Sequence, residues 1–221
     1  ADTGGNASLL YLSTTEVYSP GAGGNTGNTV FGKSAFNTST NNASDYNTMV
    51  GEDAGGTGTV AGALNNVAVG YKALEDLTSG DYNTALGTQA MASLTTGQEN
   101  IAIGQGALST ATTEAYNIAI GSGSMVSVRH DDSDSNISIG RESLSGGGNS
   151  MNSTAANAQT GTVAIGHDAL TAITTGAGNT AIGYQAGAAL IGGGGNTVLG
   201  YQALDAADDC DNNVAIGNNA M

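Results

Sequence analysis

The residues that could do chemistry gather in one acidic segment, HDDSDSN, at residues 130–136. Asp132, Asp134 and Asn136 have the alternate spacing of the first oxygen ligands in a calcium-binding loop. Such a loop also needs a glycine at its sharp turn and a closing Glu, but the glycine is missing and Ser143 stands at the Glu position. We therefore interpret the segment as a solvated acidic loop, with Asp132, Asp134 and Asn136 as weak metal candidates.

Few other residues suggest a reactive centre. His130 and His167 lie near no recurring Cys, Asp or Glu pattern, and His167 is expected on the surface. Cys210 has no neighbouring base, which argues against a nucleophile. The acidic segment at residues 205–213 (DAADDCDNN) is interpreted as solvated too, unless several chains bring its carboxylates together. The sequence predicts no enzyme and no cofactor.

The composition restricts the partners of the chain. Its 221 residues include 36 glycines and carry a formal net charge of −15, with four basic residues. Such a chain repels nucleic acid and anionic membranes, so neither is an expected partner. No run of 18 apolar residues occurs, which predicts no membrane insertion. The 39% apolar content argues against disorder and suggests that the glycines occupy fixed backbone positions.

A pentad, Asn-x-x-(large apolar)-Gly, recurs along most of the chain. Successive pentad glycines are mostly 17 residues apart, with three spacings of 19 and one of 26. A repeat this short is the signature of a solenoid. The eleven pentad glycines are Gly32, Gly51, Gly70, Gly87, Gly104, Gly121, Gly140, Gly166, Gly183, Gly200 and Gly217.

The three residues between Asn and Gly predict a short strand. The first is Thr, Val or Ile, the second is mostly Ala, and the third is always large and apolar. Alternation places the first and third on one face and the small residue on the other, and we expect the first to face inward. The first residue is Thr in only five units, which argues against an ice-binding threonine array: Thr29, Thr48, Thr84, Thr180 and Thr197.

Each pentad is followed by a second apolar signal. Three residues after the glycine stands Ala or Ser, and the next residue is Leu, Met or Phe except at Gly55 and Gly187. We therefore predict an all-β chain, a parallel β-solenoid of about eleven 17-residue coils and about 48 Å in length. A period of 17 is not divisible by six, which excludes the hexapeptide acyltransferases. One coil buries too little to fold alone, so association with partner chains is expected.

The pentad asparagine is expected to stack its amide on the next coil, and the glycine to form a corner with positive φ. A ligand or glycan role is not favoured, because a binding residue is not needed ten times in register. Thr162 replaces the asparagine once. The predicted structural ladder consists of Asn66, Asn83, Asn100, Asn117, Asn179, Asn196 and Asn213, with Gly70, Gly87, Gly104, Gly121, Gly183, Gly200 and Gly217.

These repeats resemble those of known surface fibres. NVAVG (66–70) and NIAIG (100–104) resemble the head repeats of trimeric autotransporter adhesins. NTAIGYQAG (179–187) and NTVLGYQAL (196–204) look more like repeats of bacteriophage tail-fibre and related virion fibre proteins. The resemblance covers about residues 28–221 and implies a left-handed β-roll in which three chains lie side by side. The 17-residue period is longer than that of typical adhesin heads.

The resemblance implies a structural fibre, spike or decoration protein on a virion, serving attachment. The alternative is a bacterial surface adhesin or extracellular filament subunit. Expected partners are two further copies in a homotrimer, other virion or surface proteins, and a host surface receptor; the expected location is a virion surface or a bacterial cell surface. Residues 1–27 are predicted to form a cap or docking segment and 28–221 the repeat domain. Insertions near 122–135 and 145–161 either contact a host or neighbouring molecule or have no role.

Overall fold

All eleven pentads form three-residue strands. The computed structural model describes residues 17–18, 27–36, 44–56, 59–127, 133–146 and 159–221. A two-residue strand, β1 (Val17–Tyr18), precedes the repeats. The repeat strands are β2 (Thr29–Phe31), β3 (Thr48–Val50), β4 (Val67–Val69), β5 (Thr84–Leu86), β6 (Ile101–Ile103), β7 (Ile118–Ile120), β8 (Ile137–Ile139), β9 (Val163–Ile165), β10 (Thr180–Ile182), β11 (Thr197–Leu199) and β12 (Val214–Ile216).

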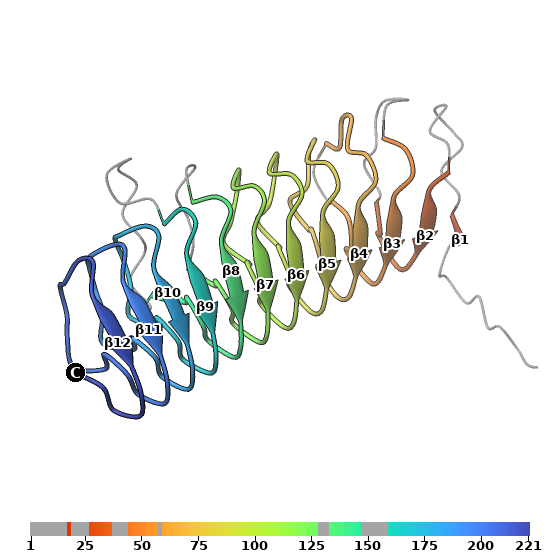
Figure 1. Ribbon diagram of the computed structural model, residues 1–221. Helices are drawn as coiled ribbons and strands as arrows, with labels where there is room; N and C mark the ends of the chain where they lie inside the picture. Colours follow the sequence, from red (N-terminus) through yellow and green to blue (C-terminus); the bar gives the residue numbers. More distant parts are fainter. Residues whose placement is uncertain (1–16, 19–26, 37–43, 57–58, 128–132, 147–158) are drawn as a thin grey trace, which may run out of the picture.

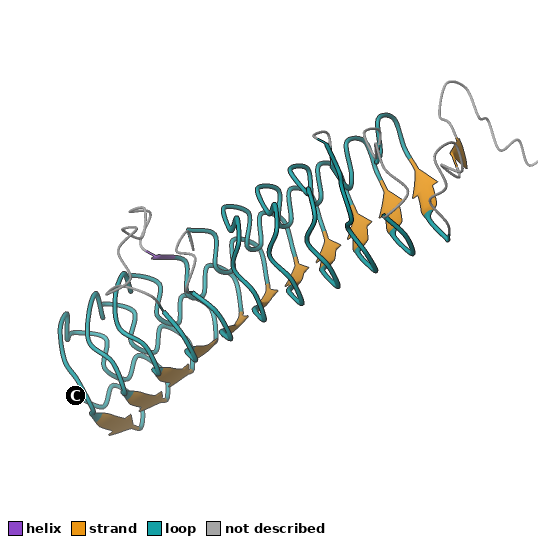
Figure 2. Ribbon diagram, turned by 90° about the horizontal axis from the view of Figure 1, so that it is seen from above, coloured by secondary structure: helices purple, strands orange, loops and turns teal. Residues whose placement is uncertain are grey.

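The strands β2–β12 form one parallel sheet in which each strand pairs only with its neighbours in the sequence. Equivalent residues pair in register, so that Ala102 of β6 lies beside Ala119 of β7. Figure 1 shows these strands side by side along an elongated body, and in Figure 2 loops and turns complete each coil. The predicted parallel β-solenoid is therefore confirmed, whereas its handedness and threefold symmetry stay predictions. In the described residues no helix is long and apolar enough to cross a bilayer.

At the amino-terminal end, β1 pairs with β2 in the opposite direction, with Val17 beside Phe31 and Tyr18 beside Val30. The open edge of β2 is thus covered by backbone hydrogen bonding, as exposed sheet edges generally require. Most of the predicted cap at residues 1–27 lies outside the described residues, as do large parts of the two predicted insertions.

The corner glycines stack on one another without room for a side chain. At Gly104, φ is 133°, and a β-carbon would lie 2.6 Å from the carbonyl carbon of Gly121 in the next coil. The equivalent approach recurs from Gly32 to Gly200. Glycine is therefore needed here both for backbone conformation and for the close contact between coils.

Three other positions in the typical coil adopt positive φ without being glycine. In the fourth coil, which contains β5, these are Tyr82, Gln89 and Met91, with φ of 58°, 57° and 49°. This conformation is unfavourable for most side chains. It is maintained because the neighbouring coils hold the backbone: the Gln89 N–H donates to the Tyr71 carbonyl at 2.9 Å, and the Met91 N–H to the Ala107 carbonyl at 2.9 Å.

The middle residue of each repeat strand faces the core and is small in most coils, and the first and third residues face outward. Ala85 and Ala102 are fully buried, whereas Leu86 is 46% exposed. The prediction that the first residue faces inward is therefore wrong. The interior is already occupied by large side chains from outside the strand, so that only a small residue fits on the inner side of the strand.

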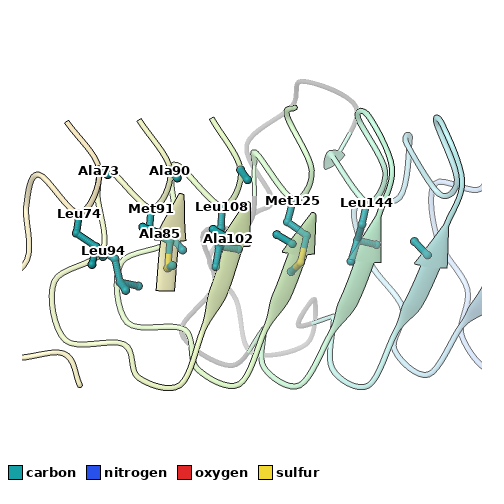
Figure 3. Packing of buried hydrophobic residues seen from close by; sticks show 14 of the residues in the cluster. Ala73, Leu74, Ala85, Ala90, Met91, Leu94, Ala102, Leu108, Met125 and Leu144 are labelled. Atoms are coloured by element: carbon teal, nitrogen blue, oxygen red, sulfur yellow. The ribbon is translucent and has the colours of Figure 1, made fainter. Parts of the chain in front are cut away.

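The core consists of alternating small and large side chains. The Ala or Ser and the Leu or Met that follow the corner glycine are buried, as are loop residues such as Leu77 and Leu94. Figure 3 shows Met91 and Leu108 beside the strand residues Ala85 and Ala102. Each coil thus supplies a few large side chains to a core shared along the whole stack, which a single coil could not form.

In β3, where the middle strand residue is methionine, a compensating small residue lies opposite it. Met49 replaces the usual Ala in β3 and is fully buried. In the same coil Gly55 replaces the usual Leu, and a β-carbon on Gly55 would lie 2.2 Å from Met49 Sδ. These two exceptions to the repeat pattern therefore form one packing unit that preserves the core volume.

A cluster of buried serines interrupts the apolar core near β8. The Ser138 hydroxyl lies 2.8 Å from that of Ser124 and 2.6 Å from that of Ser143. All three side chains are fully buried and hydrogen-bonded. Polar groups are tolerated in this core because each one finds a partner within the cluster.

We expect Gly104→Ala to destabilise the protein by about 3 kcal/mol or more, because the added methyl group must displace the backbone of Gly121. Gly106→Gln is the matched control, since Gln89 occupies the equivalent position one coil earlier and a β-carbon there has its nearest neighbour at 4.0 Å. The control should lose only about 1 kcal/mol. Urea unfolding followed by circular dichroism compares the two, and equal losses would contradict the close-approach explanation.

Substitutions at Met49 and Gly55 should be strongly coupled in their effects on the free energy of unfolding. Gly55→Leu alone overpacks the core, and Met49→Ala alone leaves a cavity, so each should cost about 2 kcal/mol or more. The double variant restores the pattern of Ala68 and Leu74 in the next coil and should be more stable than either single variant. A double-mutant cycle from urea unfolding measures the coupling, and additive losses would show that the two residues do not compensate.

Candidate functional site

The outward first and third residues of β2–β12 form a continuous surface that we name the strand face. None of these residues is charged. At about 4.8 Å between strands, the strand face is about 48 Å long. Its large apolar side chains that are at least 36% exposed are Phe31, Val67, Leu86, Ile101, Ile139, Ile182, Leu199, Val214 and Ile216.

Six exposed tyrosines border the strand face. Three of them precede the pentad asparagine: Tyr46, Tyr82 and Tyr116. Three others follow the corner glycine: Tyr71, Tyr184 and Tyr201. Each is between 43% and 63% exposed, and none belongs to the core. Each edge of the strand face therefore carries three amphipathic aromatic side chains.

A shallow depression of about 430 Å³ lies on one border, lined by Tyr82, Thr84, Glu99 and Ile101. Thr84 and Ile101 are first residues of neighbouring strands, and Tyr82 and Glu99 precede the asparagines of the same coils. Both Tyr82 and Glu99 are exposed. The depression therefore opens onto the strand face instead of penetrating the core.

On the other border, residues from consecutive coils form a row. Arg141 Nη1 lies 3.2 Å from His167 Nε2, and His167 stacks on Tyr184 with ring centroids 5.4 Å apart. Tyr184 in turn stacks on Tyr201 at 5.3 Å. His167 Nδ1 lies 2.9 Å from a carboxylate oxygen of Asp168. Because its ring contacts neighbours on several sides, His167 is half-buried, which is less exposed than the sequence predicts.

Two lysines form ion pairs with nearby glutamates. Lys33 and Lys72 contact Glu52 at 2.6 Å and Glu75 at 2.7 Å, and these hydrogen bonds raise the pKa of both lysines. Desolvation, together with the nearby charge of Glu75, raises the pKa of Asp76. These pairs lie at the surface, where such interactions contribute little to stability.

The asparagine side chains form a hydrogen-bonded column through the interior. Asn83 Nδ2 donates to the Gly97 carbonyl at 2.9 Å and to Asn66 Oδ1 at 3.1 Å. Asn83 Oδ1 accepts the backbone N–H of Asn100 at 3.0 Å. Nearly the same arrangement recurs at most coils, and the side chains from Asn47 to Asn136 are fully buried. Their amide groups are used within the column and are not presented to a ligand.

The column changes at Thr162. The Thr162 N–H still donates to Asn136 Oδ1 at 2.9 Å, but its hydroxyl oxygen is buried without a hydrogen-bond partner. In a regular coil the amide oxygen accepts the backbone N–H of the next asparagine, as Asn179 Oδ1 accepts that of Asn196 at 2.9 Å. Thr162 has no amide oxygen to accept the backbone N–H of Asn179 in this way. The column is therefore divided into two runs, Asn28–Asn136 and Asn179–Asn213.

The weak metal candidates are engaged elsewhere or lie outside the description. Asp134 Oδ1 accepts the backbone N–H of Ala115 at 2.7 Å, and Asn136 belongs to the asparagine column. Asp132 and His130 lie outside the described residues. In the part of the chain that is described, no three His, Cys, Asp or Glu side chains are grouped as metal ligands. Cys210 is half-buried, and its Sγ lies 3.9 Å from Asn196 Oδ1.

Neither the strand face nor its tyrosine borders are predicted from the sequence above. A signal was present, because the dipeptide Tyr-Asn recurs at residues 46–47, 82–83 and 116–117, and Gly-Tyr at 70–71, 183–184 and 200–201. No protein-family model, curated protein or solved structure matches the chain. The geometry of the strand face and of the asparagine column therefore carries the functional argument.

We expect Thr162→Asn to join the two runs of the asparagine column. The new amide can accept the Asn179 N–H and donate to Asn136 Oδ1, which should raise stability by about 1 kcal/mol. Hydrogen exchange of the Asn179 backbone amide should slow by about five-fold. Thr162→Ser keeps a hydroxyl but adds no amide, so it should give neither effect. Equal exchange in wild type and the Asn variant would contradict the proposed break.

Proposed function

We propose that this chain is a structural component of a fibre, spike or decoration of a virion, and that it serves attachment. The observation that carries the proposal is the single in-register sheet that continues through eleven coils. Each coil contacts its neighbours through backbone, asparagine and core interactions, so the unit is suited to span distance as a stiff rod. The repeat resemblance, NTAIGYQAG at 179–187 and NTVLGYQAL at 196–204, supports a virion fibre.

The second candidate is a surface adhesin or extracellular filament subunit of a bacterium. Its support is the shorter repeat form, such as NVAVG at 66–70, which resembles adhesin heads. Both candidates use the same physical property, a rod that presents loops along its length. Loops on a rigid scaffold are where recognition usually resides, which makes the insertions near 122–135 and 145–161 the proposed contacts with a host receptor or neighbouring protein.

The proposed assembly is a homotrimer located on the virion surface, or outside a bacterial cell in the second candidate. A net charge of −15 supports partners that are neither nucleic acid nor an anionic membrane. A single rod about 48 Å long and one coil wide is thin, and association of several copies would thicken and stiffen it.

Immunogold electron microscopy separates the two candidates. Antibodies against the purified chain are applied to virus particles and to uninfected cells from the source of the gene. We expect gold on particle appendages, with preimmune serum as the control. Gold on the surface of uninfected cells would favour the adhesin, and gold on neither particles nor cell surfaces would contradict both candidates.

A further inference from the structure

We propose that the strand face is the surface through which copies of this chain pack against one another. This inference rests on the proposed function to the extent that a fibre is built from several copies. The proposed partner of the strand face is the strand face of another copy. The strand face consists of the outward first and third residues of β2–β12, and the tyrosines lie along its borders.

Apolar exposure is the first support. Leu86 and Leu199 are 46% and 45% exposed in the single chain, and Ile182 is 38% exposed. These residues recur coil after coil and thus form a continuous apolar surface, unlike the scattered single exposures of ordinary surfaces. Burying this apolar surface would release water from the first and third strand residues along the whole length of the rod.

Charge is the second support. The chain carries 19 acidic and four basic residues, so most pairs of surfaces from two copies repel one another. The strand face is the exception, because neither outward position of any repeat strand holds a charged residue. A second copy presents the same uncharged surface. Two strand faces can therefore contact each other without charge repulsion between their first and third strand residues.

The dimensions and the borders are the third support. Three-residue strands about 10 Å long, stacked over about 48 Å, give a flat area of roughly 500 Å². The tyrosine borders widen this toward the about 800 Å² per partner of a standard stable interface. Tyrosine is enriched at such interfaces because it combines a large apolar ring with a polar tip. The exposed positions of Tyr46, Tyr82 and Tyr116 fit that role.

The test uses paired lysine substitutions and the mass in solution. Leu86→Lys together with Leu199→Lys places charges on the strand face. Ile191→Lys is the matched control, because Ile191 is 50% exposed but lies in the loop between β10 and β11. Lysine reduces the magnitude of the net charge, so any loss of association cannot result from added net repulsion. Light scattering after size exclusion and sedimentation velocity measure the mass against the chain mass of 21.5 kDa.

We expect wild type and the Ile191→Lys variant to show the same multiple of 21.5 kDa, and the double variant to shift to 21.5 kDa. Should the double variant fail to fold by circular dichroism, Leu86→Thr with Leu199→Thr replaces it, since Thr already occupies outward positions such as Thr84. That variant should weaken association at least ten-fold. A monomeric wild type, or a strand-face variant with unchanged association, would overturn the inference. Neither result depends on whether immunogold labelling finds the chain on particles.

Discussion

The structure depends on one constraint, the register that each coil imposes on the next. Two contacts enforce it. The buried asparagine amide reaches one coil forward and one coil back at every step except Thr162, and the corner glycine lies against the backbone of the following corner. A shift of one residue would leave an amide without its partners in the interior and would turn the small strand residue outward. The insertions of two and nine residues are tolerated because they fall between the pentads and leave the pentads aligned.

The same register explains how a glycine-rich chain builds a core without tryptophan or many aromatic residues. Most coils contribute a small residue from the strand and a larger one from the turn, and these alternate along the stack. The positive φ of residues such as Met91 and Leu108 directs large side chains inward from a tight turn. Hydrogen bonds from the adjoining coils stabilise that conformation, so the strain of each coil is offset by its neighbours.

Much of the fold could be predicted from the sequence, because the spacing of the pentads determines the strands and the parallel order. The direction in which each strand faces could not. Alternation distinguishes two faces of a strand, but both Ala102 and Ile103 are apolar, so hydrophobicity alone favoured burial of the larger residue. The deciding factor is the space already occupied by Leu108 and its equivalents, which belong to a different part of the coil. Residues with positive φ, such as Gln89, carry no sequence signal comparable to glycine.

The exposed strand face follows from the same geometry. A coil whose interior has room mostly for alanine on its sheet side has to place the larger strand residues outside, whether they are polar or apolar. A monomer in water would benefit from polar residues there, and Thr29 or Thr48 show that such residues fit the outward position. The chain instead retains Ile at both outward positions of β6, β7 and β8. The fold does not require isoleucine at these positions. Together with the absence of charge from this surface in a chain of net charge −15, that observation supports the proposed packing of one strand face against another.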